Sequence, residues 1–93
     1  MSTEYRIFET DHFRKELTRM LRGGKEHLYD KLTERVYPQL RHCPHFGPHI
    51  KKLRDYSPET WRYRIGPWRF FYEIDEEERI VFLTAVSHRG RAY

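Results

Sequence analysis

The chain has 93 residues, a net charge of +4 and an aromatic content of 16%. This length predicts a single domain over residues 1–93, and the aromatic content argues against a disordered chain. No apolar run approaches the roughly 20 residues that a membrane-spanning helix needs, and the N-terminus lacks the pattern of a secretory signal. The single cysteine, Cys43, cannot form an intrachain disulfide. We therefore expect a cytoplasmic protein with no membrane partner.

The positive charge is concentrated in one middle segment. Residues 41–64 contain six Lys or Arg and two acidic residues, whereas the segments on either side are close to neutral. A local basic field attracts polyanions such as RNA, DNA or an acidic protein. A solvated basic surface without any partner explains the same charge equally well.

The first quarter of the chain predicts a strand followed by a helix. Residues 4–8 alternate in the manner of a strand. Thr10 or Asp11 can cap the helix that follows, which carries one apolar stripe at helical spacing. Gly23-Gly24 would end this helix, because glycine accepts a left-handed turn.

A second apolar stripe predicts a helix over residues 25 to about 37, whose last turn Pro38 would disturb. The short connection between the two helices implies an antiparallel pair. Residues 41–59 contain three prolines and one glycine and are predicted to be mostly loop.

The second half of the chain predicts three strands. Residues 61–65 and 68–74 alternate and are joined by Gly66-Pro67, which can form a two-residue turn. Residues 80–86 are nearly all apolar, as in a central strand that is covered on both faces. The order β-α-α-β-β-β predicts an α+β domain, with a helical hairpin packed on an antiparallel sheet.

The predicted hairpin places like charges on one face. If Gly66-Pro67 is a two-residue turn, Arg64 stands opposite Arg69, and Arg62 shares their face. Like charges directly across a ladder are destabilising. A bound phosphate would offset this repulsion, since guanidinium groups match phosphate oxygens bidentately. Alternatively, the arginines splay into solvent or pair with nearby acids.

The residues after the last strand include His88, Arg89 and Tyr93. A histidine, an arginine and a tyrosine near three further arginines could supply proton transfer, charge stabilisation and a stacking surface. The same residues could also form only a frayed polar tail.

Three segments together resemble a known family. Residues 46–53 read FGPHIKKL, residues 61–74 read WRYRIGPWRFFYEI, and His88-Arg89 is followed by Tyr93. This combination is similar to the RelE/ParE superfamily of bacterial type II toxin–antitoxin toxins. The resemblance covers essentially the whole chain, because the helical hairpin also has the family's position and length.

The resemblance implies a microbial RNase-like fold. For the RelE branch it also implies metal-independent cleavage of mRNA on the ribosome, without a cofactor. In that reaction the ribose 2′-hydroxyl attacks the adjacent phosphate and leaves a 2′,3′-cyclic phosphate. By position, Arg62 and Arg64 correspond to the two basic residues before the hairpin turn, and Arg69 to the charge stabiliser after it.

The resemblance also implies roles for the C-terminal residues. Arg89 corresponds to the arginine near the leaving group, and Tyr93 to the tyrosine that orients or stacks the substrate. His88 stands where several members have a catalytic histidine. The RelE branch commonly has lysines at the positions of Arg62 and Arg64, and arginine is a poorer base because it stays protonated. The assignment of the base among Arg62, His88 and Arg89 therefore stays open, and the site can also act mainly by positioning and electrostatics.

Two other functions remain open. ParE-like members of the superfamily poison DNA gyrase and usually lack the C-terminal catalytic set. The presence of Arg69, His88, Arg89 and Tyr93 favours RNA cleavage over that function. The third possibility is a catalytically weak module that acts chiefly with its antitoxin in repressing an operon. The expected partners are a cognate antitoxin, the ribosome and mRNA, with operator DNA contacted indirectly through the antitoxin complex.

Further residues are candidates for RNA binding. Lys51, Lys52 and Arg54 lie in the basic segment and could bind phosphates without sequence preference. Phe71 shares the face of the arginines and could stack on a base.

The histidines and the cysteine of the middle segment do not predict a metal site, because their spacing is not that of a paired zinc motif. The four residues are His42, Cys43, His45 and His49.

Overall fold

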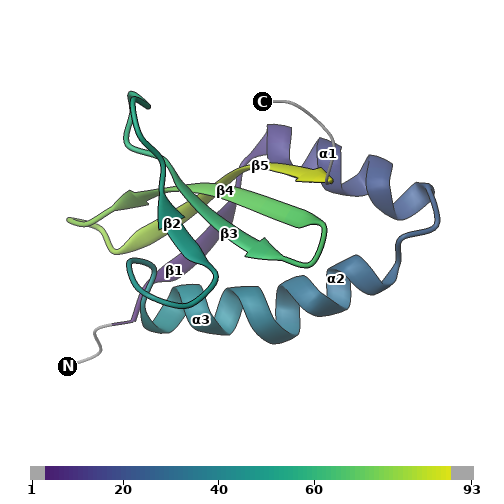
Figure 1. Ribbon diagram of the computed structural model, residues 1–93, viewed down its shortest axis with the longest axis horizontal. Coiled ribbons are helices and arrows are strands. Elements are labelled where there is room, and N and C mark those ends of the chain that lie inside the picture. The colour runs from purple at the N-terminus through teal and green to yellow at the C-terminus, as the bar shows by residue number, and fades with distance from the viewer. Residues whose placement is uncertain (1–3, 89–93) are drawn as a thin grey trace.

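The computed structural model describes residues 4–88, which form one five-stranded sheet and two helical segments (Figure 1). The elements are β1 (Arg6–Glu9), α1 (Asp11–Arg22), α2 (His27–Lys31), a π-helical turn (Leu32–Val36), α3 (Tyr37–His42), β2 (Ile50–Lys52), β3 (Trp61–Ile65), β4 (Trp68–Asp75) and β5 (Ile80–His88). The strand order is β1-β5-β4-β3-β2. The predicted α+β class, with a helical hairpin against a sheet, is confirmed. Within residues 4–88 no helix is long and apolar enough to cross a membrane.

The first helix begins and ends at the predicted residues. The Thr10 hydroxyl caps α1 by accepting from the backbone N–H of Phe13, and it donates to the carbonyl of Leu83 in β5 at 2.7 Å. Gly23 and Gly24 follow the helix, and Gly24 has a φ of +89°. The cap therefore fixes the position of α1 relative to the sheet.

The second helical segment continues to His42 rather than ending near residue 37. It passes Pro38 because a π-helical turn comes just before, in which the backbone N–H of Tyr37 donates to the carbonyl of Leu32. In a regular α-helix the ring of Pro38 would clash with the carbonyl four residues back. The wider turn gives that ring room, so the helix continues.

The sheet is mixed rather than purely antiparallel. β1 pairs with β5 in parallel, with Ile7 opposite Val81, whereas the other three pairings are antiparallel. The helical hairpin and three strands separate β1 from β5 along the chain, so no tight turn forces an antiparallel pairing. β5 is therefore internal, as its apolar sequence predicts.

A short strand lies inside the segment that was predicted to be mostly loop. β2 has three residues and pairs with β3, so that Lys51 stands opposite Arg62. It forms the edge of the sheet beside the basic part of β3.

One face of the sheet packs against the helices. Tyr72 is fully buried there, and its hydroxyl donates to the carbonyl of Pro44 at 2.7 Å. Burial raises the pKa of Tyr72, so the ring stays neutral. The alternating aromatic residues of β3 and β4 belong to this core, as the sequence predicts. Large side chains of the core from the helical hairpin and the β3–β4 hairpin include Phe13, Leu17, Leu28, Leu32, Tyr37, Leu40, Tyr63, Trp68, Phe70 and Tyr72.

The β3–β4 turn has the predicted geometry. Gly66 has a φ of +56°, and Ile65 pairs with Trp68 across the turn. Arg64 consequently stands opposite Arg69. The turn therefore sets which side chains of the hairpin share a face.

Gly66→Ala is expected to lower the free energy of unfolding by about 1 kcal/mol, because a Cβ in this left-handed conformation is strained even though the space around it is open. Urea denaturation of both proteins measures the difference. Gly66→Asn is the matched control, since asparagine tolerates the conformation better and should recover part of the loss. An unchanged stability for Gly66→Ala would contradict the turn geometry.

A polar contact joins the loop after α3 to the β4–β5 turn. The carboxylate of Glu76 lies 2.5 Å from Nε2 of His45 and accepts from the hydroxyl of Tyr5 at 2.7 Å. These hydrogen bonds, that of His45 first, lower the pKa of Glu76. The rings of Tyr5 and Trp61 pack at steep angles to the His45 ring, edge to face.

The lowered pKa of Glu76 predicts a pH dependence of stability. Its contribution is present above the unfolded pKa of about 4.3 and is lost as the pH falls through the lower folded value. Wild type should therefore lose more stability than Glu76→Gln between about pH 6 and about pH 3, as measured by thermal melting. Glu77→Gln, which removes an exposed neighbouring acid, should follow wild type. Equal pH profiles for wild type and Glu76→Gln would refute the link.

Candidate functional site

The sheet surface opposite the helices carries the predicted arginines, and we call it the arginine face. It consists of two rows of side chains that run across the strands. The first row is Lys51, Arg62, Phe71 and Ala85, and the second is Arg64, Arg69 and Ser87. Because neighbouring strands lie about 4.8 Å apart, the cations of the two rows are close enough to repel one another.

Arg62 is the most constrained cation of this face. Its side chain is partly buried, and its Nε atom is buried without a hydrogen-bond partner. Burial, then the charges of Arg64 and Arg69, lower the pKa of the Arg62 guanidinium. Within residues 4–88, no ion pair includes any of the three arginines. Among the described residues, the three arginines therefore bring hydrogen-bond donors to this face without a carboxylate partner.

Phe71 shares this face, as predicted, but only 5% of its surface is exposed. That leaves little of the ring available for stacking on a base. Phe71 instead fills the row between Arg62 and Ala85.

The C-terminal site residues are not all placed with the arginines. His88 pairs with Trp68 in the β4–β5 ladder, and the two rings meet edge to face at 4.7 Å. Since Trp68 faces the helices, His88 lies on the other side of the sheet from Arg69. Arg89 and Tyr93 lie outside the described residues.

The predicted RNA-binding residues of the middle segment divide into two groups. Lys51 joins the arginine face through its pairing with Arg62. Lys52 points elsewhere, because its Nζ lies 2.9 Å from the carboxylate of Glu59 and over the ring of Trp61. Arg54 follows β2 and lines a separate depression with Lys52 and Glu59.

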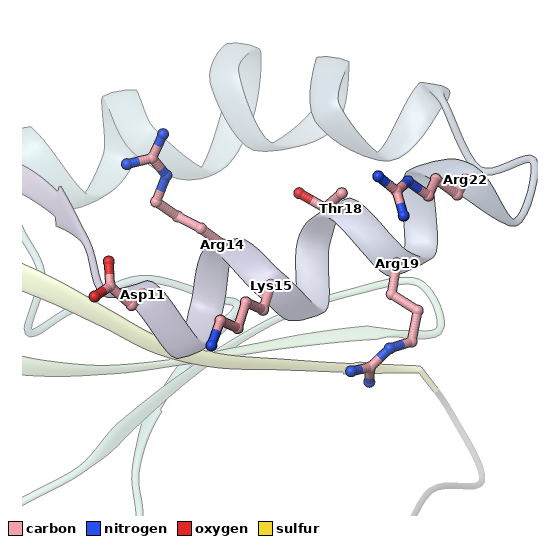
Figure 2. Close-up of a pocket in the computed structure, with 6 residues that line it drawn as sticks. All are labelled: Asp11, Arg14, Lys15, Thr18, Arg19 and Arg22. Carbon is pink, nitrogen blue, oxygen red and sulfur yellow. The ribbon is translucent and has the colours of Figure 1, made fainter.

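A second basic surface lies on α1 and was missed in the sequence. Arg14, Lys15, Arg19 and Arg22 line a shallow pocket together with Asp11 and Thr18. Figure 2 shows Arg14 on one side of the helix and Lys15 and Arg19 on the other. The helical spacing of these cations was the signal in the sequence. Acidic residues elsewhere in the first 40 residues hide it, because they bring the net charge of that segment close to zero.

Residues 4–88 contain no cluster of three side chains that could hold a metal ion. His45 is engaged by Glu76, and the His49 ring packs against that of Tyr63 at 5.5 Å. The side chains of His45 and His49 therefore take part in packing.

Comparison with known proteins assigns the chain to a family. The family model described as "ParE toxin of type II toxin-antitoxin system, parDE" matches residues 7–93. The chain belongs to the RelE/ParE family of type II toxins. No curated protein matches it.

Solved toxin structures have the same fold. The structure of the RelBE2 toxin–antitoxin complex from Mycobacterium tuberculosis is similar, with 24% identity, 98% of both chains covered and a TM-score of 0.78. The archaeal RelE–RelB complex from Pyrococcus horikoshii is similar at 22% identity and a TM-score of 0.66. The match covers 97% of this chain and 100% of the matching chain in that complex. A metal-bound toxin from Helicobacter pylori has 20% identity and a TM-score of 0.74, and the match covers 96% of this chain and 99% of that toxin.

The arginine face should destabilise the free toxin. Arg62→Met keeps the apolar stem but removes a buried donor without a partner, and we expect the free energy of unfolding to rise by about 1 kcal/mol. Urea denaturation at low salt measures the change. Arg64→Met is the control, because Arg64 is exposed and its loss should have a smaller effect. A less stable Arg62→Met protein would show that this guanidinium supports the fold.

Proposed function

We propose that this toxin is a ribosome-associated, metal-independent mRNA endonuclease that inhibits translation. The observation that supports the proposal most is the buried Nε of Arg62, which has no acceptor on a face that it shares with Arg64 and Arg69. An RNA phosphate supplies oxygen acceptors and negative charge at once, so it satisfies the donor and relieves the repulsion.

The proposed chemistry is cleavage by the 2′-hydroxyl. That hydroxyl loses its proton as it attacks the adjacent phosphorus, and the bond to the 5′-oxygen breaks. The leaving 5′-oxygen takes up a proton, and a 2′,3′-cyclic phosphate remains. Negative charge accumulates on the non-bridging oxygens in the transition state, and the guanidinium groups of Arg64 and Arg69 are proposed to stabilise it. Arg89 would act near the leaving oxygen and Tyr93 would orient the substrate, as the family resemblance implies.

We propose that Arg62 binds charge rather than acting as the base. Burial, followed by the neighbouring charges of Arg64 and Arg69, lowers its pKa in the free toxin. A bound phosphate places negative charge beside it, which reverses that effect and keeps Arg62 protonated. His88 packs against Trp68, away from the arginines. The rate would then come mainly from positioning and electrostatics.

A cognate antitoxin is the proposed inhibitor. Two of the similar structures are toxin–antitoxin complexes. An acidic antitoxin segment would cover the arginine face through the same charges that bind RNA. Operator DNA would be contacted indirectly, through the antitoxin complex.

Inhibition of DNA gyrase is the second candidate function. It is favoured by the description of the matching family model, which names the ParE toxin. On this alternative the arginine face would contact a protein rather than an RNA phosphate.

Arg69→Ala is expected to abolish mRNA cleavage in cells, because it removes a cation from the centre of the arginine face. Controlled expression in a bacterium, followed by primer extension on a reporter mRNA, should reveal cuts within translated frames for wild type. We expect a loss of at least about a hundredfold, which is the usual effect of removing one transition-state stabiliser.

Arg35→Ala is the matched control, since it removes the same charge from an exposed position on the helical layer. It should cleave like wild type. Growth arrest with intact mRNA would refute the nuclease proposal, and inhibition of supercoiling by purified gyrase would then establish the alternative. If expression causes neither growth arrest nor mRNA cleavage, the result would favour the antitoxin-binding module.

A further inference from the structure

Ser87 carries a buried hydroxyl that the fold does not use. The residue is 6% exposed, and its Oγ has no hydrogen-bond partner. Within residues 4–88, two buried side-chain polar atoms lack a partner, Arg62 Nε and Ser87 Oγ, and both belong to the arginine face. Buried polar groups in folded proteins are normally paired, so this coincidence indicates a missing ligand.

The sheet register places Ser87 beside the arginines. Ser87 pairs with Arg69 across β4 and β5, and Arg69 pairs with Arg64 across β3 and β4. Directly opposite residues have Cβ atoms about 5 Å apart. The hydroxyl and the Arg69 guanidinium can therefore reach the same small anion.

Among residues 4–88, the side chains beside Ser87 on the arginine face offer no acceptor for its proton. Arginine has only donors, and the neighbouring side chains of Phe71 and Ala85 are apolar. The Thr84 hydroxyl on the same strand, in contrast, is satisfied by the carbonyl of Phe71 at 3.2 Å. Among the described residues, no neighbouring side chain on this face supplies that acceptor, and an oxygen of a bound ligand would supply it.

We propose that Ser87 is a phosphate-binding residue of this toxin. Its hydroxyl donates to a non-bridging oxygen of the RNA phosphate with which Arg69 forms its ion pair. Because the hydroxyl is buried in the free toxin, binding requires the side chains that cover it to move aside. The inference rests on the proposed function and adds to it a neutral donor that the family resemblance does not include.

Ser87→Ala tests this role through two readouts. The affinity for a short 2′-O-methylated RNA, which cannot be cleaved, is measured by fluorescence anisotropy at low salt. We expect it to fall about tenfold, as for the loss of one hydrogen bond to a charged oxygen. The thermal midpoint of the free toxin should stay unchanged or rise, since an unsatisfied buried hydroxyl has been removed. Ser87→Cys, which is slightly larger and donates only weakly, should show the same loss of affinity.

Thr84→Val is the matched control, because it removes a satisfied hydroxyl from the same strand. It should lower the thermal midpoint and leave RNA affinity unchanged. A Ser87→Ala protein that melts earlier but binds RNA normally would overturn the proposal and make Ser87 structural.

Arg69→Gln separates this proposal from the proposed function. If Arg69→Gln loses RNA binding while Ser87→Ala binds like wild type, the role of Ser87 is refuted and the nuclease proposal stands. If wild type does not bind the RNA, or if neither substitution alters binding, both proposals fail. If Ser87→Ala loses binding to an acidic peptide but still binds the RNA like wild type, the role of Ser87 is also overturned.

Discussion

Repulsion between like charges at a fixed register is the constraint around which this toxin is arranged. A two-residue turn sets Arg64 directly opposite Arg69, and Arg62 follows two residues along the same face. The backbones that carry these residues cannot separate without breaking the ladder of the hairpin, because β4 is held on its other side by β5. The chain therefore keeps a concentrated positive charge on one surface and must obtain its stability elsewhere.

That stability comes from the opposite face of the sheet. The aromatic residues of β3 and β4 pack there against both helical segments, and the Tyr72 hydroxyl is satisfied by the carbonyl of Pro44. The Thr10 cap joins α1 to the carbonyl of Leu83, and the carboxylate of Glu16 accepts from the backbone N–H of Val86. These contacts hold α1 against β5 between Leu83, the last residue that pairs with β1, and Val86. One well-packed face thus supports the fold, while the other face carries the positive charge.

Local rules determine several features of the fold, and these could be predicted from the sequence. The length of the β3–β4 turn and the two-residue period of its strands determine which residues face each other, so the opposition of Arg64 and Arg69 follows from the residue order alone. The core face of the hairpin follows from the same alternation. The order of helices and strands follows from apolar spacing, because the elements are long enough to show their periods.

Other features depend on contacts that no local rule determines. β2 has three residues and is held by its neighbour, so it carries no period of its own. The π-helical turn that admits Pro38 overrides the usual effect of a proline within a helix.

The side of the sheet on which His88 lies could not be inferred from β5, which is apolar on both faces. That side is set by the pairing with β4, which contains an irregularity between Phe71 and Tyr72. Ser87 was missed because a serine has no special signature until its surroundings are known.

The charge stored on the arginine face makes ionic strength act on this toxin in two opposite ways. Dissolved salt screens the mutual repulsion of the exposed arginines, which favours the folded free chain. The same salt weakens attraction to a polyanion, because the release of counterions on binding becomes less favourable as the salt concentration rises. At high salt the isolated toxin is therefore most stable and attracts a polyanion least, and the converse holds in dilute buffer. A partner that neutralises the face removes this opposition, because it stabilises the fold by mass action while it is bound.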